Sequence, residues 1–241
     1  MLKKISQALL PKPLRRKMVQ MTRWPPVGQI NWGDLNRQLP ISSEWGGDRG
    51  TPVDRYYIER FIGQHARDIK GTVLEIGNDV YCSQFGGDRV KKCEILHENE
   101  RNPRASYVAD LSDAPHIPDN RFDCVICTQT LMLLAEPVAA LETIHRILKS
   151  NGVLLASVPG ISMIYEQEGE DWIDYWRFTT SALQYLTEKV FSREQIKVSS
   201  KGNVQSASAF LYGVASEELT KDVLDNNDQR FQILVLLRAV K

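Results

Sequence analysis

The sequence has only four cysteines, too few for a disulfide scaffold in a chain of 241 residues. Cys124 and Cys127 have the Cys-x-x-Cys spacing of some metal and redox sites, but no second pair follows at zinc-finger spacing. Both lie inside the apolar run 122–127. We therefore expect small buried hydrophobes, no metal site, and reduced thiols of the kind that are typical of the cytoplasm.

Long apolar runs are also missing from the sequence. No segment approaches the roughly 20 apolar residues that a membrane-spanning helix needs. The first apolar stretch, 5–10, is short and is followed by Pro11 and Pro13. We therefore expect no signal peptide and a cytoplasmic protein.

The chain has no excess of charge of either sign, because thirty basic residues balance thirty acidic ones. This balance argues against nucleic acid as a partner. Residues 1–45 differ, since seven basic residues and no acidic residue precede Asp34. We predict a basic N-terminal extension with two open interpretations. It is either a surface helix that contacts an anionic membrane or a partner protein, or a partly ordered extension with a solvated basic face.

From residue 46 onward, apolar runs of strand length alternate with segments whose apolar residues recur at helical spacing. The predicted strands are 72–77, 93–97, 105–109, 122–128, 152–158, 195–200 and 232–240, and the predicted helices are 52–67, 138–148, 180–190 and 206–219. This alternation favours one α/β domain, 46–241, with a mainly parallel seven-stranded sheet and helices on both faces. The last strand is expected to be inserted antiparallel.

In such sheets, ligands bind outside the carboxyl ends of the strands. After the first strand, Gly77 allows the backbone to turn closely past a nucleoside, and Glu75 is placed to meet the ammonium group of a methionine moiety. The alternative for Glu75 is a carboxylate that caps a neighbouring amide. His97 and Glu98 end the second strand about twenty residues later, where a ribose diol is usually held, although either could be a solvated strand end.

The next two strands end in further candidates for cofactor binding. Asp110 can accept a hydrogen bond from an adenine amino group, and the backbone amide of Leu111 can face a ring nitrogen. The alternative role of Asp110 is a turn or helix cap. Thr128 and Gln129 end the fourth strand with uncharged polar groups that suit the space beneath a transferred methyl group.

The dinucleotide fingerprint Gly-x-Gly-x-x-Gly is missing from the first turn, because Asn78, Asp79, Val80 and Tyr81 follow Gly77. A pyrophosphate needs close backbone approach and a free helix N-terminus, which this turn does not offer. The pattern weakens an NAD or FAD interpretation. It suits a sulfonium donor that carries no phosphate.

Together, these segments resemble the class I S-adenosylmethionine-dependent methyltransferases. The resemblance covers about 46–241 and is carried by VLEIG (73–77), VADL (108–111), IPDNRFDCVICTQTL (117–131) and LKSNGVLLASVPG (148–160). It implies a Rossmann-like methyltransferase fold with S-adenosylmethionine as the cofactor, lying across the ends of the first four strands. The residues expected to bind it are Glu75, Gly77, His97, Glu98, Asp110, Leu111, Thr128 and Gln129.

Three further stretches resemble a bacterial subgroup often found beside or fused to glycosyltransferases: WGGDRGTPVDRYYIERFI (45–62), DYWRFT (174–179) and GNV (202–204). This resemblance implies O-methylation of a saccharide or related small metabolite, and thus a role in polysaccharide biosynthesis. A sugar hydroxyl is a poor nucleophile that benefits from a nearby base. Asp174 is the first candidate and His116 the second. Asp174 could instead pair with Arg177, and His116 could be a surface residue.

Four residues are candidates for binding the substrate: Arg49, Tyr57, Tyr175 and Trp176. Arg49 and Tyr57 would close over the donor from the segment before the first strand. Tyr175 and Trp176 lie in an aromatic-rich segment that could stack on a sugar ring or form part of the core.

Two rival interpretations remain open at this stage. One is a non-catalytic Rossmann-like binding module with a degenerate cofactor turn, which would act through the basic N-terminus. The other is a nicotinamide-dependent oxidoreductase. The altered turn after Gly77 favours the first, while the polar strand ends at Asp110 and Gln129 argue for a cofactor site.

Overall fold

The computed structural model describes residues 11–165 and 172–241. The chain divides into two compact units, Met1–Leu39 and Pro40–Lys241. In the first unit, helix α2 (Lys12–Met21) is followed by extended chain and a short 3₁₀ turn, Gly33–Leu35. Within the described parts of the chain, no helix is long and apolar enough to cross a membrane.

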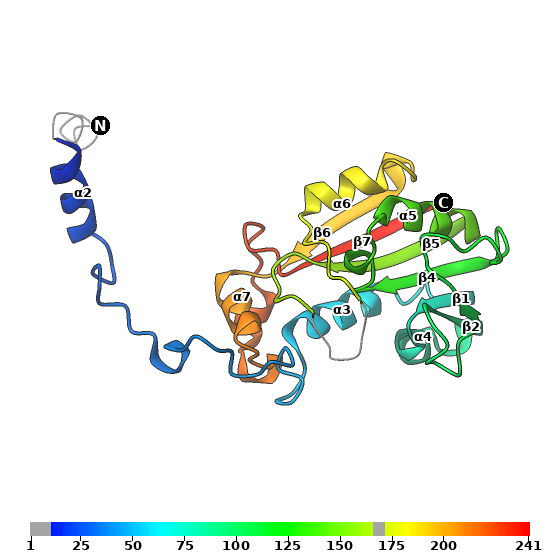
Figure 1. Ribbon diagram of the computed structural model, residues 1–241, viewed down its shortest axis with the longest axis horizontal. Helices are drawn as coiled ribbons and strands as arrows, with labels where there is room; N and C mark the ends of the chain where they lie inside the picture. The colour runs from blue at the N-terminus through cyan, green and yellow to red at the C-terminus, as the bar shows by residue number, and fades with distance from the viewer. Residues whose placement is uncertain (1–10, 166–171) are drawn as a thin grey trace. The chain divides into compact units, whose positions relative to one another are not determined.

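The second unit is built on a seven-stranded sheet in the order β3-β2-β1-β4-β5-β7-β6 (Figure 1). Its strands are β1 (Gly71–Ile76), β2 (Val90–His97), β3 (Tyr107–Val108), β4 (Phe122–Thr128), β5 (Leu148–Pro159), β6 (Ile196–Lys201) and β7 (Leu234–Val240). Strands β1 to β5 are parallel, whereas β7 lies antiparallel between β5 and β6. The predicted mainly parallel sheet with an inserted antiparallel last strand is confirmed.

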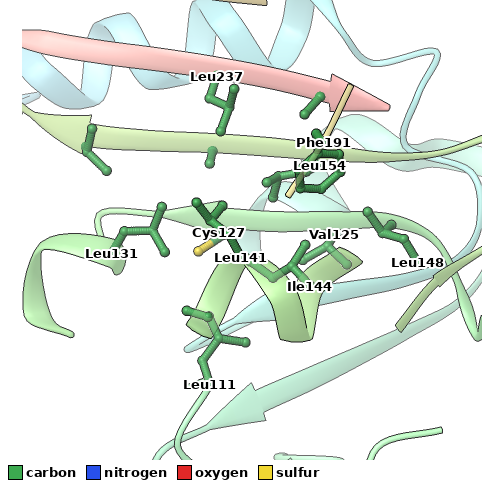
Figure 2. Close-up of a cluster of buried hydrophobic side chains, with 14 of the residues drawn as sticks. Leu111, Val125, Cys127, Leu131, Leu141, Ile144, Leu148, Leu154, Phe191 and Leu237 are labelled. Carbon is green, nitrogen blue, oxygen red and sulfur yellow. The ribbon is translucent and has the colours of Figure 1, made fainter. Parts of the chain in front are cut away.

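Helices cover both faces of this sheet because its central strands are apolar on both sides. Along β4, Val125 and Cys127 point to one face, while Cys124 and Ile126 point to the other. The first face packs against α5 (Pro137–Ile147) and α6 (Thr180–Thr187), as Figure 2 shows for Leu141 and Ile144 of α5. The second face packs against α3 (Val53–Gln64), α4 (Val80–Gly86), α7 (Val204–Leu211) and α8 (Lys221–Asp225).

Two helices differ from the sequence-based expectation. Helix α4 was not predicted, because its seven residues follow the glycine turn with no capping signal of their own. The helix expected over 206–219 is α7, which ends at Leu211 and is followed by the separate short helix α8. Gly213, at φ +69°, ends the first of them, since this conformation favours glycine.

The cysteines behave in two ways. Cys124 and Cys127 are buried free thiols, and burial raises the pKa of both, that of Cys127 to about 12. They are hydrophobic core residues, as the sequence predicts. Cys82 of α4 and Cys93 of β2 form a disulfide, which corrects the expectation that all four thiols are reduced. The two elements pack together, and this brings the residues into contact.

The topology fixes where a ligand can bind. Strand order reverses between β1 and β4, so the connections after these two strands lead to opposite sides of the sheet. A crevice forms at such a switch point, outside the carboxyl ends of the strands. Gly77, Glu98, Asp110 and Gln129 follow four neighbouring strands at this edge.

Candidate functional site

A cavity of about 410 Å³ lies at the carboxyl ends of β1 to β4. It is large enough for a cofactor of nucleoside size. The strand ends and the loops beyond them line it: Ile76, Gly77, Leu96, His97, Glu98, Ala109, Asp110, Leu111, Thr128, Gln129, Thr130, Leu133, Leu134, Trp172, Ile173 and Tyr175. We refer to it as the donor cavity. Seven of the eight predicted cofactor-binding residues line it, all except Glu75.

Gly77 forms the floor where β1 ends. Its φ of +87° lies in the region that favours glycine, and a Cβ placed there would meet nothing within 4 Å. The Gly77 amide donates to the carbonyl of Leu96 (2.8 Å), and its carbonyl accepts from Asn102 Nδ2 (2.9 Å). Both bonds hold the turn close to β2, so the backbone lies open toward the cavity.

Polar groups from β2 form one wall of the donor cavity. His97 Nδ1 lies 3.0 Å from the carbonyl oxygen of Asn99. Glu98 Oε1 accepts a hydrogen bond from Asn99 Nδ2 and another from Trp172 Nε1. Trp172 therefore links the segment after β5 to the end of β2. It places an aromatic ring over the cavity.

Asp110 and Leu111 contribute the neighbouring wall. Asp110 Oδ1 accepts from the amide of Ser112 (2.8 Å), which fixes the turn after β3. The capping role considered from the sequence is thus present, and it occupies one of the two carboxylate oxygens. Asp110 is exposed at the cavity, while Leu111 is buried with only 2% of its surface accessible.

Gln129 adopts an unusual backbone conformation for its residue type, with φ at +48°. Its amide donates to the carbonyl of Ser157 (2.8 Å), which ties the end of β4 to β5. The side-chain Nε2 donates to Asp54 Oδ2 (3.0 Å), and Oε1 is buried without a hydrogen-bond partner among the described residues. Such strain at an orphaned polar group is common where a protein binds a ligand.

A second cavity, of about 240 Å³, adjoins the first. Gln129, Leu133 and Trp172 line both cavities. The remaining lining residues are Trp45, Asp54, Arg55, Met132, Pro159, Ser162, Met163, Tyr165, Asp174 and Arg177. We call it the side cavity. A ligand in it would lie next to one in the donor cavity.

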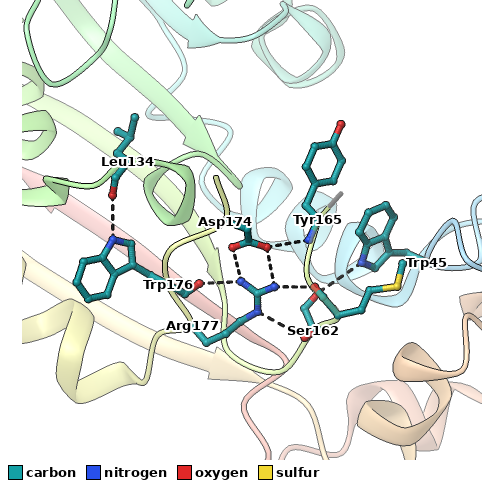
Figure 3. Close-up of polar contacts among 8 residues, drawn as sticks. Trp45, Leu134, Ser162, Tyr165, Asp174, Trp176 and Arg177 are labelled. Carbon is teal, nitrogen blue, oxygen red and sulfur yellow. Dashed lines mark hydrogen bonds and ion pairs between the residues drawn. The ribbon is translucent and has the colours of Figure 1, made fainter. Parts of the chain in front are cut away.

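Three aromatic rings, which we call the stack, follow one another along the side cavity, with the first pair nearly parallel and the second pair tilted by 33°. Trp45 lies parallel to Tyr165, with ring centroids 5.7 Å apart and an interplanar angle of 20°. Tyr165 in turn lies 5.7 Å from Trp172. Trp45 Nε1 donates to Ser162 Oγ (3.3 Å), which fixes the first ring against the segment after β5 (Figure 3). Flat aromatic faces beside polar groups suit a ring-shaped ligand with apolar and hydroxyl-bearing sides.

Asp54, in the first turn of α3, is the carboxylate that lines the side cavity beside Gln129. Burial raises the pKa of Asp54, and this effect outweighs the hydrogen bond from Gln129, which lowers it. A carboxylate with a raised pKa is a stronger proton acceptor than an ordinary one. Asp54 thus has both the position and the basicity that deprotonation of a bound hydroxyl requires.

Glu75 has the alternative role that we considered from the sequence, that of a carboxylate capping neighbouring amides. Its carboxylate is 2% exposed and accepts from the amides of Tyr81 (3.1 Å) and Cys82 (2.7 Å) in the first turn of α4. Burial raises the pKa of Glu75 to about 7 despite these two bonds. The expected contact with a ligand's ammonium group is not what the structure provides, because both oxygens cap α4.

Asp174 lines the side cavity, but its charge is neutralised (Figure 3). Arg177 Nη1 and Nη2 donate to its two carboxylate oxygens (2.5 and 2.7 Å), and the amide of Tyr165 donates to Oδ2 (2.9 Å). Although burial by itself raises the pKa of Asp174, these bonds outweigh it and lower the pKa. The pair considered from the sequence is formed, and it makes Asp174 a weak base that holds the loop in place.

Three other candidates lie away from both cavities. His116 is exposed in the loop after β3, with its ring centroid 6.4 Å from that of Tyr107. Arg49 donates two hydrogen bonds to Glu218 at the surface (2.9 and 2.5 Å). Tyr57 is 2% exposed in the core on the α3 side of the sheet. The roles in catalysis or substrate binding that we predicted for them have no support in this geometry.

The two aromatic candidates for substrate binding, Tyr175 and Trp176, have different positions, and only Tyr175 lines a cavity. Tyr175 lines the donor cavity and is held by a hydrogen bond from its amide to the carbonyl of Met132 (2.9 Å). Trp176 is 42% exposed, and its Nε1 donates to the carbonyl of Leu134 (2.9 Å). Trp176 thus anchors the loop, and only Tyr175 is positioned near a ligand.

Sequence reasoning missed Asp54, Trp45 and Tyr165 as cavity residues. Asp54 lies on the helix before the first strand, where the sequence does not distinguish a surface ion pair from a residue of the cavity wall. Trp45 and Tyr165 are 120 residues apart in the chain, so only the tertiary structure shows that their rings stack. The available signal was the aromatic-rich composition of both segments. It gave no information about which rings face the cavity.

The donor cavity fits S-adenosylmethionine by its chemistry. Asp110 and Glu98 provide carboxylates at the ends of β3 and β2, and Gly77 provides an open backbone. No phosphate-binding turn is needed for this cofactor. Among the described residues, no group of three or more His, Cys, Asp or Glu side chains could hold a metal ion.

Comparison with known proteins supports the same assignment. Residues 63–156 match the family model described as a methyltransferase domain. The fold is similar to that of an S-adenosylmethionine-dependent methyltransferase from Mesorhizobium loti, with 13% identity, a TM-score of 0.53, and coverage of 78% of this chain and 98% of that one. One from Archaeoglobus fulgidus has 13% identity, a TM-score of 0.52, and coverage of 78% and 94%.

No curated protein matches the sequence. The family match covers β1 to β4 and most of β5, and it includes every lining residue of the donor cavity except Trp172, Ile173 and Tyr175. The seven-stranded sheet with its antiparallel β7 belongs to a fold that is similar overall to the two solved structures. Residues 63–156 therefore match a methyltransferase domain in a chain whose fold is shared with these two structures, and S-adenosylmethionine is the cofactor that the match and the donor cavity support.

Proposed function

We propose that this methyltransferase methylates a hydroxyl group of a saccharide or a related small metabolite that binds in the side cavity. The observation that carries the proposal is the placement of Asp54 and the Trp45–Tyr165–Trp172 stack beside the donor cavity. An aromatic stack with an adjacent carboxylate is suited to a ring that bears hydroxyl groups. The resemblance of 45–62 and 174–179 to methyltransferases found beside glycosyltransferases also favours a sugar.

The bound cofactor supplies an electrophilic methyl group on a sulfonium, and transfer is an in-line displacement governed by positioning. In our proposal, the acceptor oxygen would bond to the methyl carbon as the methyl–sulfur bond breaks and S-adenosylhomocysteine leaves, and Asp54 would accept the proton of the acceptor hydroxyl. Gln129 orients Asp54 through its Nε2. Trp172 covers both cavities and excludes water from them.

The test is a transfer assay with methyl-labelled S-adenosylmethionine and a panel of acceptors. The panel contains methyl glycosides and oligosaccharides, together with catechols, amines and peptides. We expect label on saccharide hydroxyls, in an alkali-stable ether linkage. Label only on nitrogen, sulfur or aromatic hydroxyls would contradict the proposed acceptor class while leaving the methyltransferase assignment intact.

A pair of variants tests where the acceptor binds. Trp45→Ala removes one ring of the stack, and we expect it to raise the acceptor KM without changing cofactor binding. Trp176→Ala is the matched control, since this exposed ring lines neither cavity. Equal effects of the two substitutions would argue against the side cavity as the acceptor site.

A further inference from the structure

Helix α2 presents an apolar face that no other described residue of its unit buries. None of its residues is buried, and Leu14, Met18 and Met21 are 50%, 50% and 79% exposed. Spacings of four and three residues place these three side chains on one side of a helix. The exposed face is therefore continuous along the helix.

The opposite side of α2 is basic. At 100° per residue, Lys12 and Arg16 lie across the helix from the apolar face, and Arg15 and Lys17 flank that face on its two sides. No acidic residue precedes Asp34 to neutralise these charges. A short helix with one basic side and one apolar side suits an interface between water and anionic headgroups.

Two tryptophans extend the apolar surface beyond the helix. Trp24 is 89% exposed and Trp32 is 56% exposed. Indole rings favour the headgroup region of a membrane, where one edge is apolar and the other is hydrated. A ten-residue helix is also marginal in water by itself, so contact with a surface would stabilise it.

We infer that residues 11–32 form a docking surface for an anionic lipid bilayer. The basic side chains would interact with the headgroups, while Leu14, Met18, Met21 and Trp24 would insert at the acyl boundary. Nucleic acid fits less well, because exposed aliphatic side chains contribute little to phosphate binding. The inference does not depend on the identity of the methyl acceptor.

The test is sedimentation of the full chain with phosphatidylcholine vesicles that contain or lack phosphatidylglycerol. We expect binding only to the anionic vesicles. Arg15→Ala combined with Arg16→Ala should weaken binding to the anionic vesicles about 30-fold, since each charge contributes roughly a factor of five. Alanine is used because it preserves the helix. The matched control is Arg193→Ala with Lys197→Ala, two exposed charges of the other unit, which should bind as the unaltered chain does.

Leu14→Ser combined with Met18→Ser tests the apolar face without changing the charge. We expect this pair to weaken binding to anionic vesicles as well. The blue shift of the chain's tryptophan emission, which we expect when Trp24 enters the headgroup region, should then become smaller. Three results would overturn the inference: no binding to anionic vesicles, an equal loss in the control pair, or tight binding to heparin or DNA with none to vesicles.

Discussion

Gln129 Nε2 donates a hydrogen bond to Asp54 Oδ2 at 3.0 Å, and this bond joins the end of β4 to the first turn of α3. Gln129 lines both cavities, whereas Asp54 lines only the side cavity and not the donor cavity. The bond therefore connects the place where a cofactor binds with the place where we expect an acceptor. It also restricts the direction in which the Asp54 carboxylate faces.

Asp54→Asn should lower kcat about 10²- to 10⁴-fold with a saccharide acceptor, because asparagine keeps the size of the side chain but cannot accept the proton. Binding of S-adenosylhomocysteine, measured by calorimetry, should not change. Glu59→Gln on the same helix is the control and should retain full activity. A full rate in Asp54→Asn would exclude this residue as the base.

Activity should also depend on the protonation of Asp54. The base must be deprotonated, and burial raises its pKa above the ordinary value of 3.8. Activity should therefore fall as the pH is lowered through this raised pKa, in a range where an ordinary aspartate remains charged. The pH–rate profile of the unaltered chain checks this. An acidic limb at the ordinary aspartate value would contradict it.

Asp110 should contribute to cofactor binding through the carboxylate oxygen that the Ser112 amide does not occupy. Asp110→Asn retains an oxygen for that amide, so the turn after β3 should persist. We expect affinity for S-adenosylhomocysteine to fall by about 1–3 kcal/mol, since a buried donor on the ligand loses its partner. Asp88→Ala, an exposed acid beyond α4, is the control. Unchanged affinity would remove Asp110 from the site.

Glu75 should make the protein less stable as the pH rises. Its pKa is about 7 in the folded chain against an ordinary value of 4.5, so folding favours the protonated form. Between pH 4.5 and 7, the folded chain holds a proton that the unfolded chain releases, and about 3 kcal/mol of stability is lost. Urea denaturation at pH 5 and pH 7 should show about 2 kcal/mol of this loss in the unaltered chain and a smaller loss in Glu75→Gln. If the stability of the unaltered chain and of Glu75→Gln depended on pH in the same way, Glu75 would not be the group with the raised pKa.

The ion pair between Asp174 and Arg177 should stabilise the folded chain. The Asp174 side chain is 2% exposed, and Asp174→Ala would leave the Arg177 guanidinium with backbone carbonyl acceptors and no carboxylate to balance its charge. We expect a loss of about 3 kcal/mol in urea denaturation. Arg177→Leu added to Asp174→Ala should recover part of this loss, because no unpaired charge remains. If the double variant is less stable than the single one, the ion pair is not the cause.

The sequence alone was sufficient for the sheet and for most of the donor cavity. Strand β4 has the predicted bounds of 122–128, because a buried strand bordered by polar residues leaves a clear pattern. The chemistry that depends on tertiary contacts was not predictable. Glu75 lies two residues before the turn, but only the unpredicted helix α4 provides the amides that it caps. The sequence does not show that Asp54 is a neighbour of Gln129, because this contact depends on how α3 packs in the folded chain.

The most direct test of the account is a calorimetric titration of the full chain with S-adenosylmethionine. We predict saturable binding with one molecule of cofactor per chain, weakened in Asp110→Asn and unchanged in Asp88→Ala and Asp54→Asn. No detectable binding at about 1 mM cofactor, which corresponds to less than about 4 kcal/mol of binding free energy, would contradict the assignment of the donor cavity.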